Sequence, residues 1–243
     1  MPTSVDSNGL ATMFNSVLMP EIAFFNDFYR DTLKGRNSNP SLFLNHQLSK
    51  AALDSLFSGG TKGRYVFSNK IQSINYVECH DNYTFYDQFK LYGLDEQTIK
   101  KDAKIVFAMI LFSKGIPFIH SGQEMLRTKY GCENSYNLPD SVNRMPWHLL
   151  IPNGDLFESV RLLISIRKEL IFEDYDFIST KQENSLIEVN FKCNHNKLKL
   201  VINLNNYAIK YTLNNKEKII FGNEDYNVNE NKLNHGIIIV RSE

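Results

Sequence analysis

The sequence predicts an α/β protein followed by a smaller antiparallel β region. Within the first 170 residues, three short and almost entirely apolar runs alternate with helical patterns, and after residue 186 short alternating strands are separated by turn residues. Apolar strands that alternate with helices are typical of a parallel sheet buried on both faces. Alternation of apolar and polar residues between turn signals is typical of antiparallel pairing.

The first apolar run covers residues 22–25 and stops at Asn26 and Asp27. The chain is then broken by residues 34–41, since Gly, Asn, Ser and Pro favour turns. Residues 44–57 place leucine and alanine side chains on one helical face. This spacing predicts an amphipathic helix that ends before the glycine pair 59–60.

The second apolar run, residues 71–77, leads into the polar residues 78–82 and then into a helical pattern over roughly 95–114. The third run, residues 116–120, leads through a long polar loop to an amphipathic helix over 155–170. All three runs finish in polar clusters. Because the carboxyl ends of strands carry the chemistry in α/β barrels, we expect the functional side chains at these ends.

The C-terminal region predicts five short strands. They are Leu186 to Phe191, Leu198 to Asn203, Tyr207 to Leu213, Ile219-Ile220 and Ile237 to Arg241. We interpret residues 171–184 as a linker. The predicted domains are therefore residues 1–170 and residues 171–243, the second being a small antiparallel β-sandwich.

Three βα units do not complete a barrel, which has eight strands and typically about 250 residues. The pattern by itself leaves two alternatives open. The first is a small open α/β sheet. The second is the last part of a (β/α)8 barrel whose first strands are elsewhere.

Composition excludes several classes of function. Lys plus Arg and Asp plus Glu both number 27, so no net charge favours nucleic acid or an anionic membrane. The three cysteines form no CxxC pair and the histidines show no metal spacing. We predict no cofactor, and the sequence gives no sign for or against a structural calcium ion.

No signal peptide is predicted, and the longest apolar run, 105–112, is far shorter than the ~20 residues that span a bilayer. These features favour a cytoplasmic location.

One local motif carries a family resemblance. The nine residues from Tyr76 to Thr84, YVECHDNYT, resemble the strand-end His-Asp signature of the α-amylase superfamily, in the form found in pullulanase-type debranching enzymes. Residues 19–35, 114–127 and 134–143 are similar to neighbouring segments of the same enzymes, and Pro2-Thr3 fits the residues after their Glu-Gly-Trp motif. The resemblance covers residues 2–170 closely, and it implies the last three βα units of a (β/α)8 TIM barrel.

The resemblance also implies roles for individual residues. Asp81 matches the carboxylate that stabilises the transition state, and His80 matches the imidazole that contacts the sugar beside the scissile bond. Asp27 and Arg30 match positions near the leaving side of the substrate; the alternative is a surface ion pair. Two further residues, Asp140 and Arg144, match the loop that lines the donor subsites; the alternative is that they only order that loop.

The implied reaction is hydrolysis of α-1,6-glucosidic bonds in branched α-glucans such as pullulan, limit dextrin or glycogen. A retaining glycosidase needs a nucleophilic carboxylate and a carboxylic acid about 5–5.5 Å apart. In the family both precede the position of Pro2-Thr3, so we expect this chain to lack them and to be inactive in isolation. Two hypotheses follow: part of a longer enzyme whose missing N-terminal half is supplied elsewhere, or a glucan-binding or inactive remnant.

Overall fold

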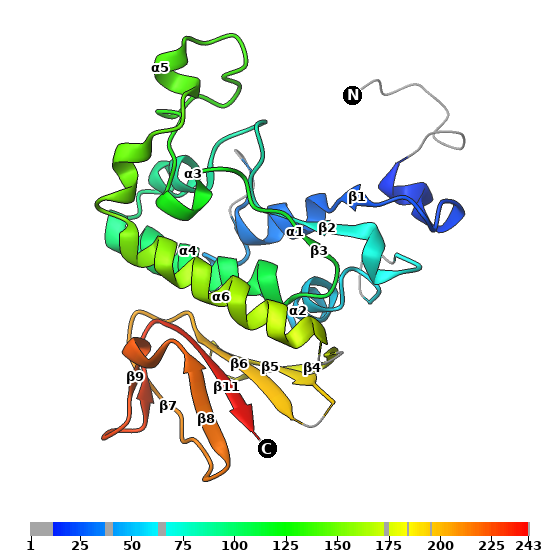
Figure 1. Cartoon of the computed structure of the whole chain (residues 1–243), viewed down its shortest axis with the longest axis vertical. Helices are drawn as coiled ribbons and strands as arrows, with labels where there is room; N and C mark the ends of the chain where they lie inside the picture. Colours follow the sequence, from blue (N-terminus) through cyan, green and yellow to red (C-terminus); the bar gives the residue numbers. More distant parts are fainter. Residues whose placement is uncertain are drawn as a thin grey trace.

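The computed structural model describes residues 12–36, 41–62, 67–172, 175–183, 185–194 and 196–242. The helices are α1 (Asp27–Leu33), α2 (Lys50–Phe57), α3 (Phe85–Leu91), α4 (Glu96–Phe112), α5 (Asp140–Asn143) and α6 (Gly154–Phe172). The strands are β1 (Phe24–Phe25), β2 (Ser73–Asn75), β3 (Ile116–Pro117), β4 (Asp176–Glu183), β5 (Leu186–Lys192), β6 (Lys197–Asn203), β7 (Ile209–Lys210), β8 (Glu217–Phe221), β9 (Tyr226–Asn227), β10 (Lys232–Leu233) and β11 (Gly236–Ser242). Helices occupy one end of the molecule and antiparallel strands the other (Figure 1).

The first three strands form a parallel sheet in the order β1-β2-β3. Each begins within a run that the sequence predicted, but each is only two or three residues long. Buried polar groups tie these short strands together. The Asn26 side chain donates to the Ser73 hydroxyl at 2.9 Å, and the Asn75 side chain donates to the Lys114 carbonyl at 2.9 Å.

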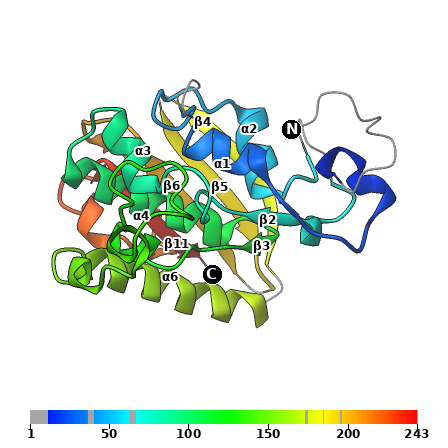
Figure 2. The same cartoon turned by 90° about the horizontal axis from the view of Figure 1, so that it is seen from above.

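Helix α4 is the centre of the apolar core. Asp95 caps its N-terminus by accepting from the Thr98 backbone N–H, and twelve of its residues are buried. A helix that is apolar on most sides must be covered on most sides. Helix α6 lies along α4, and strand β11 packs against α4 from the β region (Figures 1 and 2). One continuous apolar cluster therefore joins the helices to the β region.

The C-terminal strands form two antiparallel sheets. The larger has the order β4-β5-β6-β11-β8, and the smaller has the order β7-β10-β9. One face of the larger sheet, including Ile187, Leu200 and Ile239, belongs to the main core. Its other face, including Val201 and Ile238, packs with Tyr211, Tyr226 and Leu233 in a second apolar cluster. Strict alternation along each strand produces these two faces.

Two sequence predictions were wrong in detail. The helix predicted over 44–57 begins only at Lys50, because residues 42–46 form turns, His46 has a φ of 54° and Ser49 caps the helix by accepting from the Ala52 backbone N–H. The linker predicted over 171–184 contains strand β4, whose residues pair along β5. Its polar composition hid it, since β4 is the outer strand of the larger sheet and exposes alternate residues.

The structure confirms a mixed α/β fold, with parallel pairing in the first part and antiparallel pairing in the second. The barrel origin, the sandwich and the boundary after residue 170 stay predictions. Pro2-Thr3 lies outside the described residues. No helix in the described ranges is both long and apolar enough to cross a membrane.

Candidate functional site

His80 and Asp81 lie on the loop that joins β2 to α3, at the carboxyl end of the middle parallel strand. Both side chains are well exposed, and His80 Nε2 lies 3.4 Å from Asp81 Oδ1. Asn82, with a φ of 62°, reverses the chain immediately after them. Thr84 then caps α3 by accepting from the Asp87 backbone N–H. A tight turn between a strand and a capped helix therefore presents the two side chains to solvent.

Two buried lysines hold this loop in place. Lys129 donates to three backbone carbonyls: those of His80 at 3.1 Å, Asn82 at 2.5 Å and Glu133 at 2.9 Å. Lys34 donates to the Tyr83 carbonyl at 2.7 Å. Burial lowers the pKa of Lys34 to about 8 and also lowers the pKa of Lys129. The nearby carboxylate of Glu78 acts in the opposite direction on both ammonium groups.

Glu78 stabilises the loop from inside the protein and does not lie on its exposed face. Its carboxylate is 1% exposed and accepts from the Phe85 backbone N–H at 2.6 Å. Its other oxygen lies 2.9 Å from Nδ1 of His120, which follows β3. This pair joins the loop after β2 to the segment after β3. Because both oxygens are engaged and shielded, Glu78 is poorly suited to exchange protons with a substrate.

Asp27 and Arg30 form a second polar group, at the carboxyl end of the neighbouring strand β1. Asp27 Oδ1 lies 3.0 Å from Arg30 Nη1, and both contact the Tyr76 hydroxyl, which donates to Asp27 at 2.6 Å and accepts from Arg30 at 2.8 Å. Burial and the hydrogen bond to Asp27 raise the pKa of Tyr76. Arg30 is buried, whereas the Asp27 side chain is 45% exposed. The sequence therefore located a real ion pair, and Tyr76 links it to the segment between strand β2 and Asp81.

Three aromatic rings form a surface beside these polar groups. Phe25 meets Tyr76 edge to face at 4.9 Å between ring centroids and Phe118 at 5.1 Å. One ring comes from the end of each parallel strand. Phe25 is 45% exposed, so part of this apolar surface faces solvent. Aromatic faces beside carboxylate and imidazole groups are suited to a ligand with both apolar and hydroxyl surfaces.

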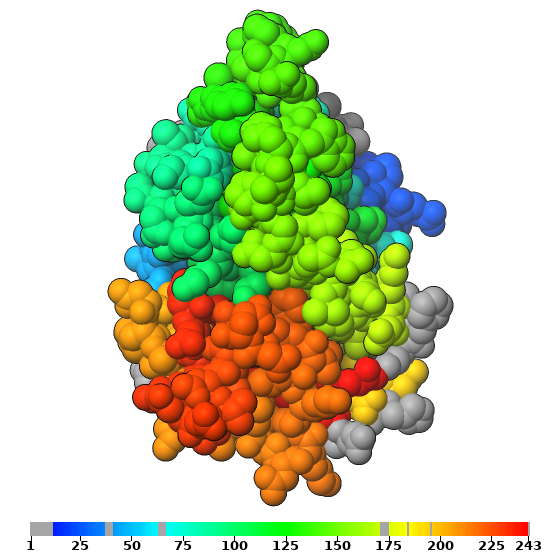
Figure 3. Space-filling model, turned by 60° about the vertical axis from the view of Figure 1, so that its left-hand side comes forward, coloured from blue at the N-terminus to red at the C-terminus, as the bar shows by residue number. Residues whose placement is uncertain are grey.

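In the described ranges, the side chains of Asp140 and Arg144 form no ion pair with the other candidate residues. Both are exposed and lie at α5, on a loop that projects from the body of the molecule (Figures 1 and 3). The Arg144 backbone N–H donates to the Asp140 carbonyl at 2.8 Å, and within the described ranges their side chains form no ion pair with each other. The loop is ordered instead by Asn143, which donates to the carbonyls of Ser135 and Leu138.

Sequence reasoning missed the supporting residues Lys34, Lys129, Glu78 and His120. Nothing in their local spacing marks them, because each acts on a partner at least 40 residues away or across a loop. The one available signal was the position of Glu78, two residues before His80 and directly after an apolar strand. In the described part of the chain, no group of three or more His, Cys, Asp or Glu side chains is placed to hold a metal ion.

Comparison with known proteins gives consistent results. No protein-family model matches the chain. A pullulanase of Bacillus subtilis strain 168 is 38% identical over 166 residues, which are 65% of this chain and 23% of that protein. The crystal structure of a pullulanase from Anoxybacillus sp. LM18-11 superposes with a TM-score of 0.84 and 29% identity, over 98% of this chain and 37% of that one. The pullulanase of Paenibacillus barengoltzii in complex with maltohexaose and α-cyclodextrin superposes with a TM-score of 0.78 and 26% identity, over 96% of this chain and 40% of that one. The chain thus spans less than half the length of each of these proteins.

Proposed function

The chain is homologous to the C-terminal part of pullulanase-type debranching enzymes, and on that basis we propose that it supplies one side of an active site that hydrolyses α-1,6-glucosidic bonds in branched α-glucans. Asp81 is the proposed stabiliser of the transition state. The single observation that carries the proposal is the exposed His80–Asp81 pair on a loop held by Lys129 and Lys34. Such a carboxylate must be both accessible and fixed in position.

The chemistry assigns a distinct task to each proposed residue. Glycoside hydrolysis proceeds through an oxocarbenium-like transition state, in which positive charge develops on the sugar ring. A fixed carboxylate at Asp81 favours that charge and accepts hydrogen bonds from ring hydroxyls, which supply several kcal/mol when they strengthen in the transition state. His80 donates to a sugar oxygen. Asp27 and Arg30, fixed by Tyr76, contact the leaving side of the substrate.

The retaining mechanism needs two more carboxyl groups, a nucleophile and an acid. The carboxylates that surround the loop are already engaged: Glu78 with Phe85 and His120, and Asp87 with Thr128 and Lys129. We therefore propose that this chain does not complete the double displacement alone. The nucleophile and the acid come from an N-terminal barrel segment, on the same polypeptide or on a partner.

The same observation, that the carboxylates around the loop are already engaged, favours a second function. The chain would then be a glucan-binding remnant without turnover. Asp140 and Arg144, on their projecting loop, would then contact glucan without acting on it. The chemistry of binding is the same in both cases, so only catalysis separates them.

The test measures reducing ends released from pullulan by the pure chain, and by the chain co-expressed with the part of the Bacillus subtilis pullulanase that precedes its matching region. We expect no turnover by the chain alone, and turnover with the added segment that Asp81→Asn abolishes. Turnover by the chain alone, lost in Asp81→Asn, would overturn the proposed inactivity. Maltohexaose binding that His80→Ala weakens, without turnover in either case, favours the remnant. The absence of both maltohexaose binding and turnover overturns the proposed function.

A further inference from the structure

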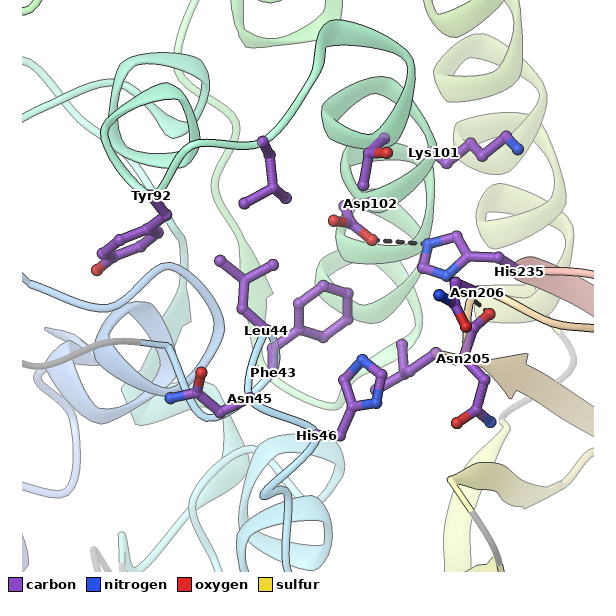
Figure 4. A pocket seen from close by; sticks show the side chains of 13 residues that line it. Phe43, Leu44, Asn45, His46, Tyr92, Lys101, Asp102, Asn205, Asn206 and His235 are labelled. Carbon is purple, nitrogen blue, oxygen red and sulfur yellow. Dashed lines mark hydrogen bonds and ion pairs between the residues drawn. The ribbon is translucent and has the colours of Figure 1, made fainter.

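A cleft of about 790 Å³ lies between the helical part and the β region, lined by none of the residues of the candidate site. Its walls are the turn before α2, the start of α4, and the loops that follow β6 and β10 (Figure 4). Sites for small molecules commonly have volumes of about 300–1,000 Å³, so this cleft has room for an organic ligand.

The rim of the cleft carries uncommitted polar side chains. Asn45 and His46 project from the turn before α2, and Asn206 projects from the loop after β6 on the facing wall (Figure 4). All three are exposed, and their side chains make no hydrogen bond to any described residue. An amide both donates and accepts, as does a neutral imidazole. Groups of this kind match a ligand that carries many hydroxyls.

Part of the lining is apolar. Phe43 is buried, and Leu44, Leu94 and Tyr92 are partly exposed. A sugar ring presents C–H groups on its faces and hydroxyls on its edge. A lining that combines apolar side chains, an aromatic ring and amides is complementary to both surfaces.

Charge within the cleft is nearly balanced, which argues against an ionic ligand. Asp102 and His235 pair across the two parts, with Oδ1 and Nε2 2.9 Å apart, and the other ring nitrogen of His235 lies 3.2 Å from the Asn205 carbonyl. Lys101 is the remaining charged side chain of the lining. One exposed ammonium group is a weak anchor for an anion. The same pair fixes the two walls to each other, so the cleft is formed before any ligand arrives.

We propose that this cleft binds a segment of α-1,4-linked glucan, apart from the His80–Asp81 loop. The identity of the sugar rests on the proposed function, whereas the neutral polyhydroxyl character of the ligand rests on the lining. A site here would hold a second stretch of a large substrate beside the helical part. Tyr92 supplies the stacking surface, and Asn206 with Asn45 supplies the hydrogen bonds.

The experiment measures binding of labelled maltohexaose by equilibrium dialysis and locates it by hydrogen–deuterium exchange of the whole chain. The double variant His80→Ala/Asp81→Asn removes the candidate active site. Tyr92→Ala and Asn206→Ala address the cleft, and their matched controls are Tyr207→Ala and Asn234→Ala, which alter exposed residues next to it. Inorganic phosphate serves as the anionic probe.

We expect maltohexaose to protect residues 43–46 and 204–206 in both the wild type and the double variant. Loss of a stacking surface or of one hydrogen bond is worth about 1 kcal/mol, so each cleft variant should weaken binding about fivefold while the controls bind as the wild type does. Unchanged binding in both cleft variants, absence of protection in the cleft, or protection by phosphate in place of maltohexaose would overturn the proposal. Should Tyr92→Ala fail to fold, as judged by its thermal melt, the exposed Asn206→Ala decides. Protection confined to the cleft counts against glucan binding at the His80–Asp81 loop but not against the cleft.

Discussion

At the scale of single residues, Lys129 is the most informative side chain, although it belongs to no recognisable sequence motif. Lys129 is 2% exposed, and its ammonium group is surrounded by three carbonyl oxygens. Burying a charge is costly unless every proton finds an acceptor, and here each of the three protons has one. Two of these acceptors flank Asp81. Lys129 therefore fixes the backbone on both sides of Asp81, although the turn itself is exposed to solvent.

We predict that Lys129→Met destabilises the chain by about 2–3 kcal/mol, since hydrogen bonds to a charged group are each worth about 1.5–3 kcal/mol and water can replace some of them. The variant should also speed amide exchange over residues 80–84. Urea unfolding and hydrogen–deuterium exchange measure the two effects.

The matched control for this change is Lys90→Met, which alters an exposed lysine on α3. We expect its unfolding free energy to stay within about 0.5 kcal/mol of the wild type, as is usual for surface positions. Equal effects of the two substitutions would show that the carbonyl contacts of Lys129 do not hold the loop.

At the scale of elements, helix α4 is joined to the turn before β11 by the Asp102–His235 pair. Burial opposes the charge of His235, but the hydrogen bond and the negative charge of Asp102 outweigh it and raise the pKa of the imidazole. A raised pKa means that the folded state favours the protonated form. The stabilisation is therefore complete below the ordinary pKa of about 6.5 and disappears as the pH rises through the higher folded value.

We predict that His235→Gln costs about 2 kcal/mol near pH 6 and progressively less as the pH rises above the folded pKa of His235. Unfolding midpoints of the wild type and the variant, compared at each pH, cancel the titration of all other groups. His46 and Asp95 also act electrostatically on Asp102, so His46→Gln is the control and should not reproduce this pH dependence. A difference that stays constant with pH would contradict a protonated His235.

At the scale of the whole molecule, the parallel sheet has two open edges. In the described ranges, β1 and β3 each pair with β2 alone. Large apolar side chains in or beside the parallel sheet are exposed: Phe14 78%, Leu18 73%, Ile71 54%, Phe25 45% and Ile116 42%. Open strand edges and extended apolar patches promote association with another chain.

We predict that the isolated chain self-associates in a concentration-dependent way, as measured by sedimentation velocity. Replacing Phe14 and Leu18 together with serine should shift the population towards the monomer, because this removes apolar area from the exposed face. The control replaces Leu162 and Ile178, which are exposed elsewhere, and should leave the association unchanged. A single monomeric boundary with a cooperative melt in the wild type would refute the prediction.

Local patterns were sufficient for the longest buried helix and for a central strand of the larger sheet. The apolar spacing of residues 99–110 predicted α4, and the alternation of residues 198–203 predicted β6. They failed at a local turn that interrupts a helical pattern and at an edge strand of polar composition. Residues 44–49 share the helical spacing of α2, yet the turn at His46 and the cap at Ser49 delay the helix. Strand β4 pairs along β5 despite its polar composition.

The sequence by itself determined the α/β class, the position of His80–Asp81 directly after an apolar strand and the similarity to pullulanase-type enzymes, because each depends on residues that are neighbours along the chain. Only the tertiary structure decided what holds that pair. Lys129 lies 47 residues after Asn82, and Tyr76 lies 49 residues after Asp27, so their contacts exist only once the strands align. The cleft between Asn45 and Asn206 is likewise formed by packing of the two parts. Long-range contacts of this kind leave no local pattern, because the residues next to a lysine in the sequence do not show whether its side chain will be buried.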